Sequence, residues 1–220
     1  MIKLVDSPKS NQSSTQRTYQ TLRKEIITGR LPPGERLKVE TLKENYGTGA
    51  SPVREALSLL TSDQLVERLD QRGFRVAKTS GPQFQEILNL RCNLEDLALR
   101  KSIELGDQNW EEELVLSHHY LARAERSDLE AFEVRHKSFH MTLLMACDSP
   151  ILLRFCDQLY DLNVRYRYLA GTSKSYGHRN IDSEHQAILE AAVNRQTDKA
   201  VEVLIEHYRS TGAFLSDLIG

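Results

Sequence analysis

Residues 47–76 constrain the fold of this chain more than any other stretch. A turn broken by glycines runs into a segment whose apolar residues recur at helical spacing. Two short segments with alternating apolar and polar residues follow, at 66–69 and 74–77, and a tight turn with Arg72 and Gly73 joins them. The order of turn, helix and two-stranded wing predicts a winged helix-turn-helix, a fold that places a helix in the major groove of DNA.

The N-terminal end of the predicted recognition helix carries the side chains expected to read bases. Ser51 is predicted as the N-cap and Pro52 as the first helical residue, and Arg54 can pair bidentately with guanine. The basic residue that starts the preceding helix can reach a phosphate, and the arginine-glycine pair at the wing tip suits a narrow minor groove. The predicted DNA-contacting residues are therefore Lys38, Ser51, Arg54, Arg72 and Gly73. An ion pair of Arg54 with Glu35 or Glu55, and a solvated turn at Arg72, remain alternatives.

Charge is distributed unevenly along the 220 residues, although the net charge is only −2. Residues 1–80 hold 14 Lys and Arg against 9 Asp and Glu, whereas residues 81–220 hold 15 against 22. A basic N-terminal part on an acidic body is expected when only one domain meets phosphate. Three cysteines without metal-site spacing favour a reduced, cytoplasmic protein, and no apolar run approaches the ~18 residues of a membrane span.

The chain is predicted to be mainly α-helical, with a small winged domain before a helical bundle. Residues 1–16 are polar and predicted to be a disordered arm, and 17–78 form the winged helix-turn-helix. Residues 79–81 form a linker. Six helical patterns then fill 82–220 without a strand pattern between them, which predicts an all-helical bundle for effector binding and dimerisation.

Several sequence segments resemble one family of bacterial regulators. GERL, SPVREAL, LVER and RGFRVA, in this order between 17 and 77, resemble the N-terminal domain of GntR-family transcription regulators. Ala50 stands where many members carry an arginine, and Gln64 where a glycine is usual, so the operator sequence cannot be transferred. RCNLEDLAL, FEVRHKSFHMTLLMA, DSEHQAILEAA and AVEVLIEHY resemble the FCD domain of the FadR-like subgroup.

Four histidines of the bundle are candidate metal ligands. His136 and His140 lie four residues apart and share a helix face, and His185 and His207 lie within apolar stripes of two later helices. Many FCD domains hold a divalent metal with three histidines and one aspartate, and the resemblance implies His140, His185 and His207 as ligands. His136 then stands at the aspartate position. The site is either a four-histidine site, with Zn or Ni as the expected metal, or a three-histidine site with His136 displaced.

The histidines also allow an alternative interpretation, and nearby arginines predict a second kind of site. Separate histidines bonded to carbonyls are the alternative to a metal site, and His118 and His119 are expected to be exposed. Arg91 with Arg165 or Arg167, of which Arg165 is chosen, is predicted to clamp a small carboxylate that also reaches the metal. An ordinary pair of Arg91 with Glu95 is the alternative.

Together these features predict a DNA-binding transcription regulator that responds to a metabolite. We expect a cytoplasmic homodimer that represses transcription from a palindromic operator, without enzymatic activity or membrane contact. The alternative is a helical metal-binding protein with a metallohydrolase-like or scaffold role. Lys137 occupies the position where a zinc protease of the HExxH type needs a glutamate, which argues against the enzyme. The operator, the regulated genes, the effector, the metal and the direction of regulation remain open.

Overall fold

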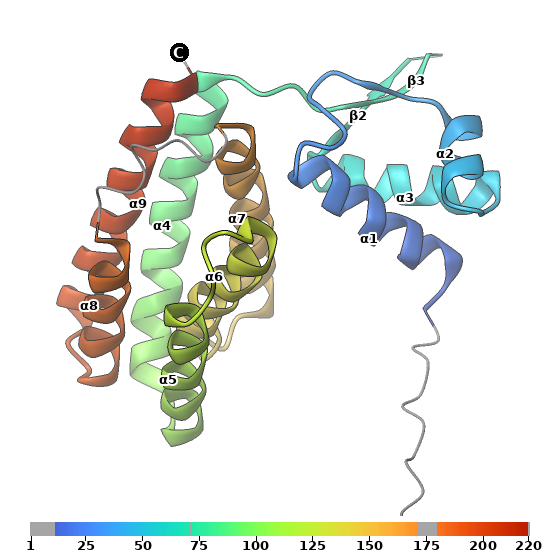
Figure 1. The fold of residues 1–220 in the computed structure, drawn as a ribbon. Helices are drawn as coiled ribbons and strands as arrows, with labels where there is room; N and C mark the ends of the chain where they lie inside the picture. Colours follow the sequence, from blue (N-terminus) through green and yellow to red (C-terminus); the bar gives the residue numbers. More distant parts are fainter. Residues whose placement is uncertain (1–11, 71, 171–179, 220) are drawn as a thin grey trace, which may run out of the picture. The chain divides into compact units, whose positions relative to one another are not determined.

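The structure, a computed structural model, describes residues 12–70, 72–170 and 180–219 (Figure 1). The chain divides between Lys78 and Thr79 into two compact units. No helix in the described ranges is long and apolar enough to cross a membrane.

The N-terminal unit combines three helices with a three-stranded sheet. Its elements are α1 (Ser14–Ile27), β1 (Arg36–Leu37), α2 (Val39–Asn45), α3 (Ala50–Ser62), β2 (Val66–Leu69) and β3 (Gly73–Val76). The strands are antiparallel in the order β1-β3-β2, and β2 and β3 form the hairpin of the wing. This is the predicted winged helix-turn-helix.

One apolar stripe fixes the position of α3 in this unit. Val53, Ala56, Leu57 and Leu60 recur at helical spacing and are fully buried. They pack against α1, which buries Leu22 and Ile26. Because this stripe faces the core, the opposite face of α3 is left to solvent.

Three local features of this unit differ from what the sequence indicated. The N-cap of α3 is Gly49 rather than Ser51, because α3 begins at Ala50 and places Ser51 inside its first turn. Residues 14–16, predicted as part of the arm, are the first residues of α1, and Ser13 caps that helix by accepting a hydrogen bond from the Gln16 amide. Residues 1–11 of the predicted arm lie outside the described residues.

The third difference is the strand β1, which was not predicted from the sequence. Arg36 and Leu37 pair with Arg75 and Phe74 of β3. A two-residue strand exists through this pairing and has no periodicity of its own, so the local sequence carries no signal for it.

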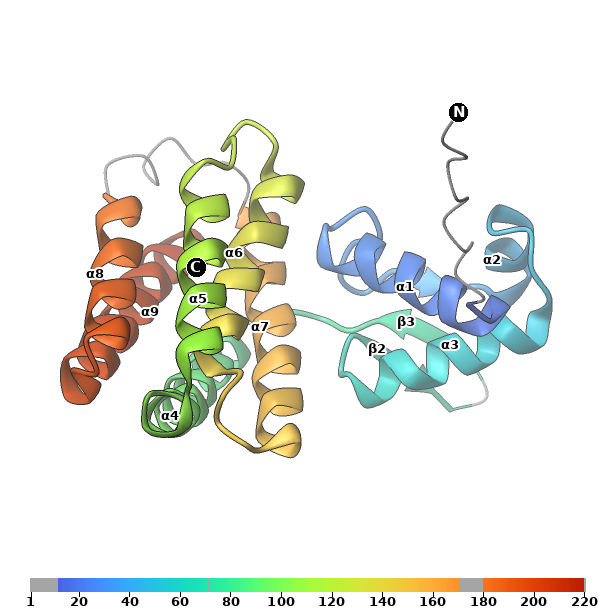
Figure 2. The same ribbon diagram turned by 90° about the horizontal axis from the view of Figure 1, so that it is seen from below.

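The C-terminal unit is a bundle of long helices. They are α4 (Gly81–Leu105), α5 (Gln108–Ala122), α6 (Leu129–Leu144), α7 (Pro150–Ala170), α8 (Ile181–Val193) and α9 (Thr197–Ile219). The helix α4 packs against α6, α7 and α9, and α5 lies between α6 and α8 (Figure 2). The core contains fully buried Leu99, Leu114, Phe139, Leu143 and Leu204. The predicted fold class, a mainly α-helical chain with a winged helix-turn-helix before a bundle, is confirmed.

Candidate nucleic-acid interface and buried histidine cluster

The winged unit has a concave surface between α3 and the β2–β3 hairpin. Its volume is about 450 Å³, and its lining residues are Arg54, Ser58, Arg68, Leu69, Gly73 and Phe74. Arg54 projects from the exposed face of α3, and Gly73 adopts a φ of +90° at the wing turn, a conformation that favours glycine. We call this surface the basic concavity.

The other predicted DNA-contacting residues are also exposed. Lys38 stands at the N-cap of α2, Ser51 in the first turn of α3 and Arg72 in the wing turn. Within the described ranges Arg54 makes no ion pair, so neither alternative pairing with glutamate is present. Glu55 instead accepts hydrogen bonds from the hydroxyls of Thr15 and Ser51. The contacts of these residues with DNA stay a prediction.

Arg68 belongs to the basic concavity but was not predicted from the sequence. It is exposed and lies opposite Phe74 in the β2–β3 register. Its position could have been predicted, because alternation along a strand places Arg68 on the same sheet face as buried Val66. The inner face of the hairpin therefore extends past the core and presents an arginine beside α3.

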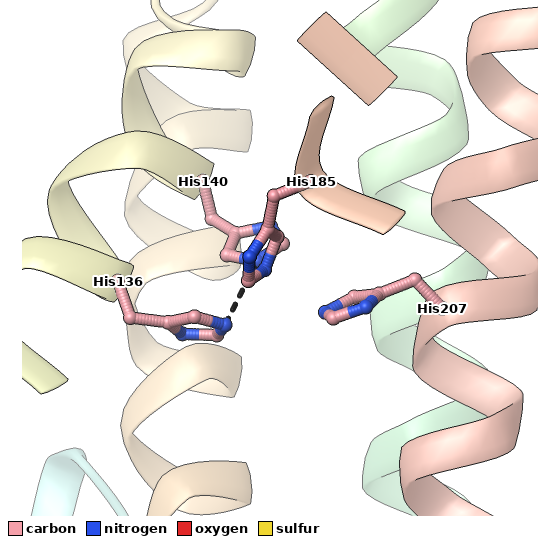
Figure 3. Close-up of side chains that lie close together, drawn as sticks. All are labelled: His136, His140, His185 and His207. Atoms are coloured by element: carbon pink, nitrogen blue, oxygen red, sulfur yellow. Dashed lines mark hydrogen bonds between the residues drawn. The ribbon is translucent and has the colours of Figure 1, made fainter. Parts of the chain in front are cut away.

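The bundle brings the four predicted histidines together. His136 and His140 come from α6, His185 from α8 and His207 from α9, and all four are at most 4% exposed. One ring nitrogen from each lies within 4.8 Å of the others (Figure 3). We call this group the histidine cluster. His136 is part of it and is not displaced.

Three of these rings have a partner for Nδ1. His136 Nδ1 lies 2.6 Å from the Tyr160 hydroxyl, and His140 Nδ1 lies 2.9 Å from the Tyr208 hydroxyl. His207 Nδ1 lies 2.7 Å from a carboxylate oxygen of Glu184. These contacts leave the Nε2 atoms for the centre of the cluster, where Nε2 of His136 and His140 are 3.2 Å apart.

His185 differs from the other three histidines. Neither of its ring nitrogens has a hydrogen-bond partner in the part of the chain that the structure describes, although the side chain is buried. A neutral imidazole contains one donor and one acceptor, and buried polar atoms are nearly always satisfied. The cluster therefore contains ring nitrogens whose natural partner is a group outside the protein chain.

Burial also sets the protonation state of the cluster. Desolvation, followed by the positive charge of Arg167, lowers the pKa of His136 well below 6.5. Desolvation and the neighbouring histidines lower the pKa of His140 in the same way, and burial lowers the pKa of His185 to about 2. These rings are neutral near pH 7, which is the form of histidine that binds a metal ion.

Arg91 is buried beside the histidine cluster and pairs with Glu95, as the alternative prediction held. Its Nε donates to Glu95 at 2.6 Å and its Nη1 to Asn163 at 3.2 Å. The guanidinium carbon lies 4.7 Å from the ring centroid of Tyr160 and 4.0 Å from that of Tyr208. Nη2 is buried and has no hydrogen-bond partner within the described ranges.

The second arginine at the histidine cluster is Arg167 and not Arg165. Arg167 pairs with Glu133, and its Nη2 lies 3.2 Å from His136 Nδ1 and 3.1 Å from the Tyr160 hydroxyl. Arg165 is also buried on α7. Two residues turn a helix by about 200°, so Arg165 projects from the side of α7 opposite Arg167. The structure therefore does not support its selection as the partner of Arg91.

One predicted exposure is wrong and several neighbours of the cluster were missed. His118 is buried and its ring packs edge-on against Phe139, with 5.4 Å between centroids, whereas His119 is exposed. The missed residues are Glu133, Tyr160, Glu184 and Tyr208. Glu133 lies three residues before a predicted ligand and Tyr208 next to another, which is a weak signal. No local pattern points to Tyr160.

A winged helix-turn-helix followed by a helical bundle defines a class of protein, the regulators that carry a DNA-binding domain and a second, all-helical domain in one chain. Residues 14–76 match the model of bacterial regulatory proteins of the gntR family, and residues 86–210 match the FCD domain. The chain belongs to the GntR family of bacterial transcription regulators and carries the FCD domain.

Known relatives share this arrangement over most of their length. The chain is 31% identical to the HTH-type transcriptional repressor GlaR of Escherichia coli K12, over 86% of this chain and 90% of that protein. It is 37% identical to the uncharacterized HTH-type transcriptional regulator BphR of Paraburkholderia xenovorans LB400, over 91% and 84%. The solved structure of E. coli McbR/YncC superposes with a TM-score of 0.81 at 25% identity, and the match covers 93% of this chain and 97% of that one.

The family decides between the predicted function classes. GntR-family members are DNA-binding transcription regulators, so this chain is a regulator and not an enzyme. At Lys137, where a metallohydrolase would need a base, the ammonium pairs with Asp157 at 2.6 Å and Asp161 at 2.7 Å.

Proposed function

We propose that this protein is a metabolite-responsive repressor whose bundle binds a divalent metal ion together with a small carboxylate. The observation that carries the proposal is the histidine cluster, with four ring nitrogens within 4.8 Å of one another and no partner for either nitrogen of His185 in the described structure. A single ion at its centre would bind one nitrogen of each ring, including one of the two that lack a partner at His185.

The donor set supports zinc or nickel. Nitrogen ligands bind Zn at about 2.0–2.1 Å, so a small inward shift of the rings suffices to surround one ion. Imidazole favours Zn, Ni, Cu and Fe over the harder Mg and Ca. In many FCD domains an aspartate holds the position of His136, so the metal-loaded centre would here carry one positive charge more.

The added charge and Arg91 together support an anionic effector. A buried divalent ion held by neutral imidazoles is favoured by a nearby anion. Nη2 of Arg91 is a buried donor without a partner in the described ranges, and its guanidinium is planar and matches a carboxylate. Arg167 also borders the histidine cluster, where it pairs with Glu133.

The winged unit supports the regulatory output. We propose that two copies form a homodimer that reads a palindromic operator in the cytoplasm, with the basic concavity facing the duplex. The E. coli relative GlaR is named a repressor, which favours repression here. The dimer would have two conformations that differ in their affinity for DNA, and the effector would bind one of them more tightly than the other.

Metal titration of the purified chain tests the central claim. Wild-type protein stripped with a chelator is expected to bind one Zn²⁺ or Ni²⁺ per chain. His185→Ala is expected to bind it at least about tenfold more weakly, because one ligand is lost. His119→Ala, at an exposed position of α5, is the matched control. Equal affinity of wild type and His185→Ala would contradict the proposal.

Calorimetric titration with small dicarboxylates tests the effector. The metal-loaded Arg91→Ala protein is expected to bind them more weakly than wild type by about tenfold or more. Arg100→Ala is the control, since Arg100 lies on the same helix in exposed pairs with Asp96 and Asp198. Unchanged binding by Arg91→Ala would remove the carboxylate from the proposal and leave the metal.

A further inference from the structure

Two chains of hydrogen bonds with the same order of residues run outward from the α6 histidines. The first joins His140 Nδ1 to the Tyr208 hydroxyl at 2.9 Å, and that hydroxyl contacts Glu95, which pairs with Arg91. The second joins His136 Nδ1 to the Tyr160 hydroxyl at 2.6 Å. That hydroxyl lies 3.2 Å from Glu133, which pairs with Arg167.

We propose that Tyr160 and Tyr208 are positioning residues, which hold His136 and His140 in the tautomer that turns the Nε2 lone pair toward the metal. The inference rests on the proposed metal binding and assigns a role to residues outside the four ligands.

The direction of each hydrogen bond follows from the donors available. An ionised carboxylate only accepts hydrogen bonds, so the single hydroxyl proton of each tyrosine goes to its glutamate. In the first chain the Tyr208 oxygen can then accept a proton only from the imidazole, which places hydrogen on Nδ1 of His140. The Tyr160 oxygen also accepts a hydrogen bond from Arg167 Nη2 at 3.1 Å, and its shorter contact of 2.6 Å with His136 Nδ1 takes its proton from the imidazole. A neutral imidazole with hydrogen on Nδ1 has its lone pair on Nε2. In both rings this atom lies at the centre of the histidine cluster.

The charges along both chains support these directions. Both tyrosines are buried, and a phenol has a pKa of about 10, so both hydroxyls keep their protons near pH 7. The ion pairs of Glu95 with Arg91 and of Glu133 with Arg167 favour the ionised form of both carboxylates. Each chain pairs one arginine with one glutamate and adds no net charge around the ligands.

The remaining two histidines are held differently. His207 contacts Glu184, whose side chain is 30% exposed, and His185 has no outer partner within the described residues. The two rings of α6 are therefore the pre-oriented half of the site. Groups that orient metal-bound histidines typically change metal affinity by 10–100-fold when they are removed.

Two hydroxyl deletions test this role in the full-length protein. Tyr160→Phe and Tyr208→Phe are each expected to lower Zn²⁺ affinity by about 10–100-fold, measured by competition with a chromophoric chelator. Tyr166→Phe is the control, because the Tyr166 hydroxyl lies on α7 but contacts Ser80 and Gln83. The absorption bands of the Co²⁺-loaded protein are expected to change in the first two variants and not in the control.

A measurement on wild type keeps the test valid even where a variant fails to fold. Long-range ¹H–¹⁵N correlation spectra of the Zn²⁺-loaded protein are expected to show His136 and His140 protonated on Nδ1. Protonation on Nε2 at either ring, or Tyr→Phe variants that bind Zn²⁺ as tightly as the control, would overturn the positioning role. A wild-type protein that binds no metal would instead overturn the proposed function.

Discussion

His185 is the histidine of the cluster whose polar atoms are least satisfied by the protein. Its two ring nitrogens are buried without a hydrogen-bond partner in the described ranges, whereas its three neighbours each use Nδ1. A buried polar group left unsatisfied costs about 1–3 kcal/mol. A ligand that binds only the folded chain stabilises it, and this stabilisation grows with the logarithm of the ratio of ligand concentration to Kd. We therefore expect the metal to contribute to stability as well as to sensing.

The depressed pKa values of the histidine cluster predict a pH-dependent stability of the metal-free protein. In the unfolded chain histidine has a pKa of about 6.5, whereas the pKa values of His136, His140 and His185 are lowered by burial in the folded chain. As pH falls below about 6.5 the unfolded state takes up protons that the folded state does not. The free energy of unfolding should then fall by up to about 1.4 kcal/mol per histidine and pH unit.

Urea denaturation of chelator-treated protein between pH 7.5 and 5 measures this dependence. His185→Gln removes one titrating group, so its curve should be shallower than that of wild type by about one proton. A free energy of unfolding that stays constant over this range would show that the rings titrate normally in the folded state.

For individual residues, the sequence predicts the candidate metal ligands better than it predicts the residues that hydrogen-bond to them. His136 and His140 are predictable because spacing along one helix fixes their geometry. Tyr160 and Tyr208 are not, because their contacts depend on how α7 and α9 pack against α6 and α4. The choice between Arg165 and Arg167 depends on packing for a related reason, since both lie on α7 and only Arg167 contacts the cluster in the described structure.

Among the elements, the β2–β3 hairpin contributes more to the basic concavity than the sequence indicated. Its long-range partners set its exposed face: β3 pairs with β1, and buried Val66, Phe74 and Val76 hold the inner face against the core. Arg68 then lies on that same face at the open end, beside Arg54 of α3. Helix and hairpin were predictable from periodicity, but the short strand β1 was not.

This placement predicts that Arg68 contacts a DNA phosphate. Arg68→Gln is expected to weaken binding by a similar factor for specific and unrelated duplexes. It should also reduce the slope of log K against log salt by about 0.9. Fluorescence anisotropy at several salt concentrations measures both quantities, with Arg100→Gln in the bundle as control. A change limited to one base pair of the operator would assign Arg68 to base reading instead.

The connection between α4 and α5 predicts a stability effect at a glycine. A Cβ built on Gly106 would lie 2.4 Å from the Trp110 ring and 2.6 Å from the Ser102 carbonyl oxygen. Gly106→Ala is therefore expected to lower the free energy of unfolding by about 1–3 kcal/mol. Gly81→Ala is the control, because a Cβ there meets no atom within 4 Å. Thermal melts that give the two variants the same Tm would contradict this.

On the scale of the whole molecule, the two units carry different chemistry and separate cores. The division between Lys78 and Thr79 coincides with the change from a basic to an acidic part of the sequence. This division of labour was predictable because charge and periodicity both change there. The gathering of the histidine cluster was predictable only through the family resemblance, since its four residues come from three helices.

Hydrogen exchange resolved by mass spectrometry tests that division. Zn²⁺ is expected to increase protection of α6, α8 and α9, whose histidines it would join. A DNA duplex is expected to increase protection of α3 and the β2–β3 hairpin. Protection that rises uniformly over both units on adding Zn²⁺ alone would show that the ion does not act through the histidine cluster.

The four imidazoles also bring together helices that make few direct contacts with one another, α6 on one side and α8 and α9 on the other. The helix α6 packs on α4, α5 and α7, while α8 and α9 pack mainly on each other and on α5 and α4. An ion held by His136 and His140 on one side and by His185 and His207 on the other would cross-link α6 to α8 and α9. The packing of α6 against α8 and α9 would then depend on the concentration of free metal in the cell. The conformation that any effector meets when it binds would depend on it as well.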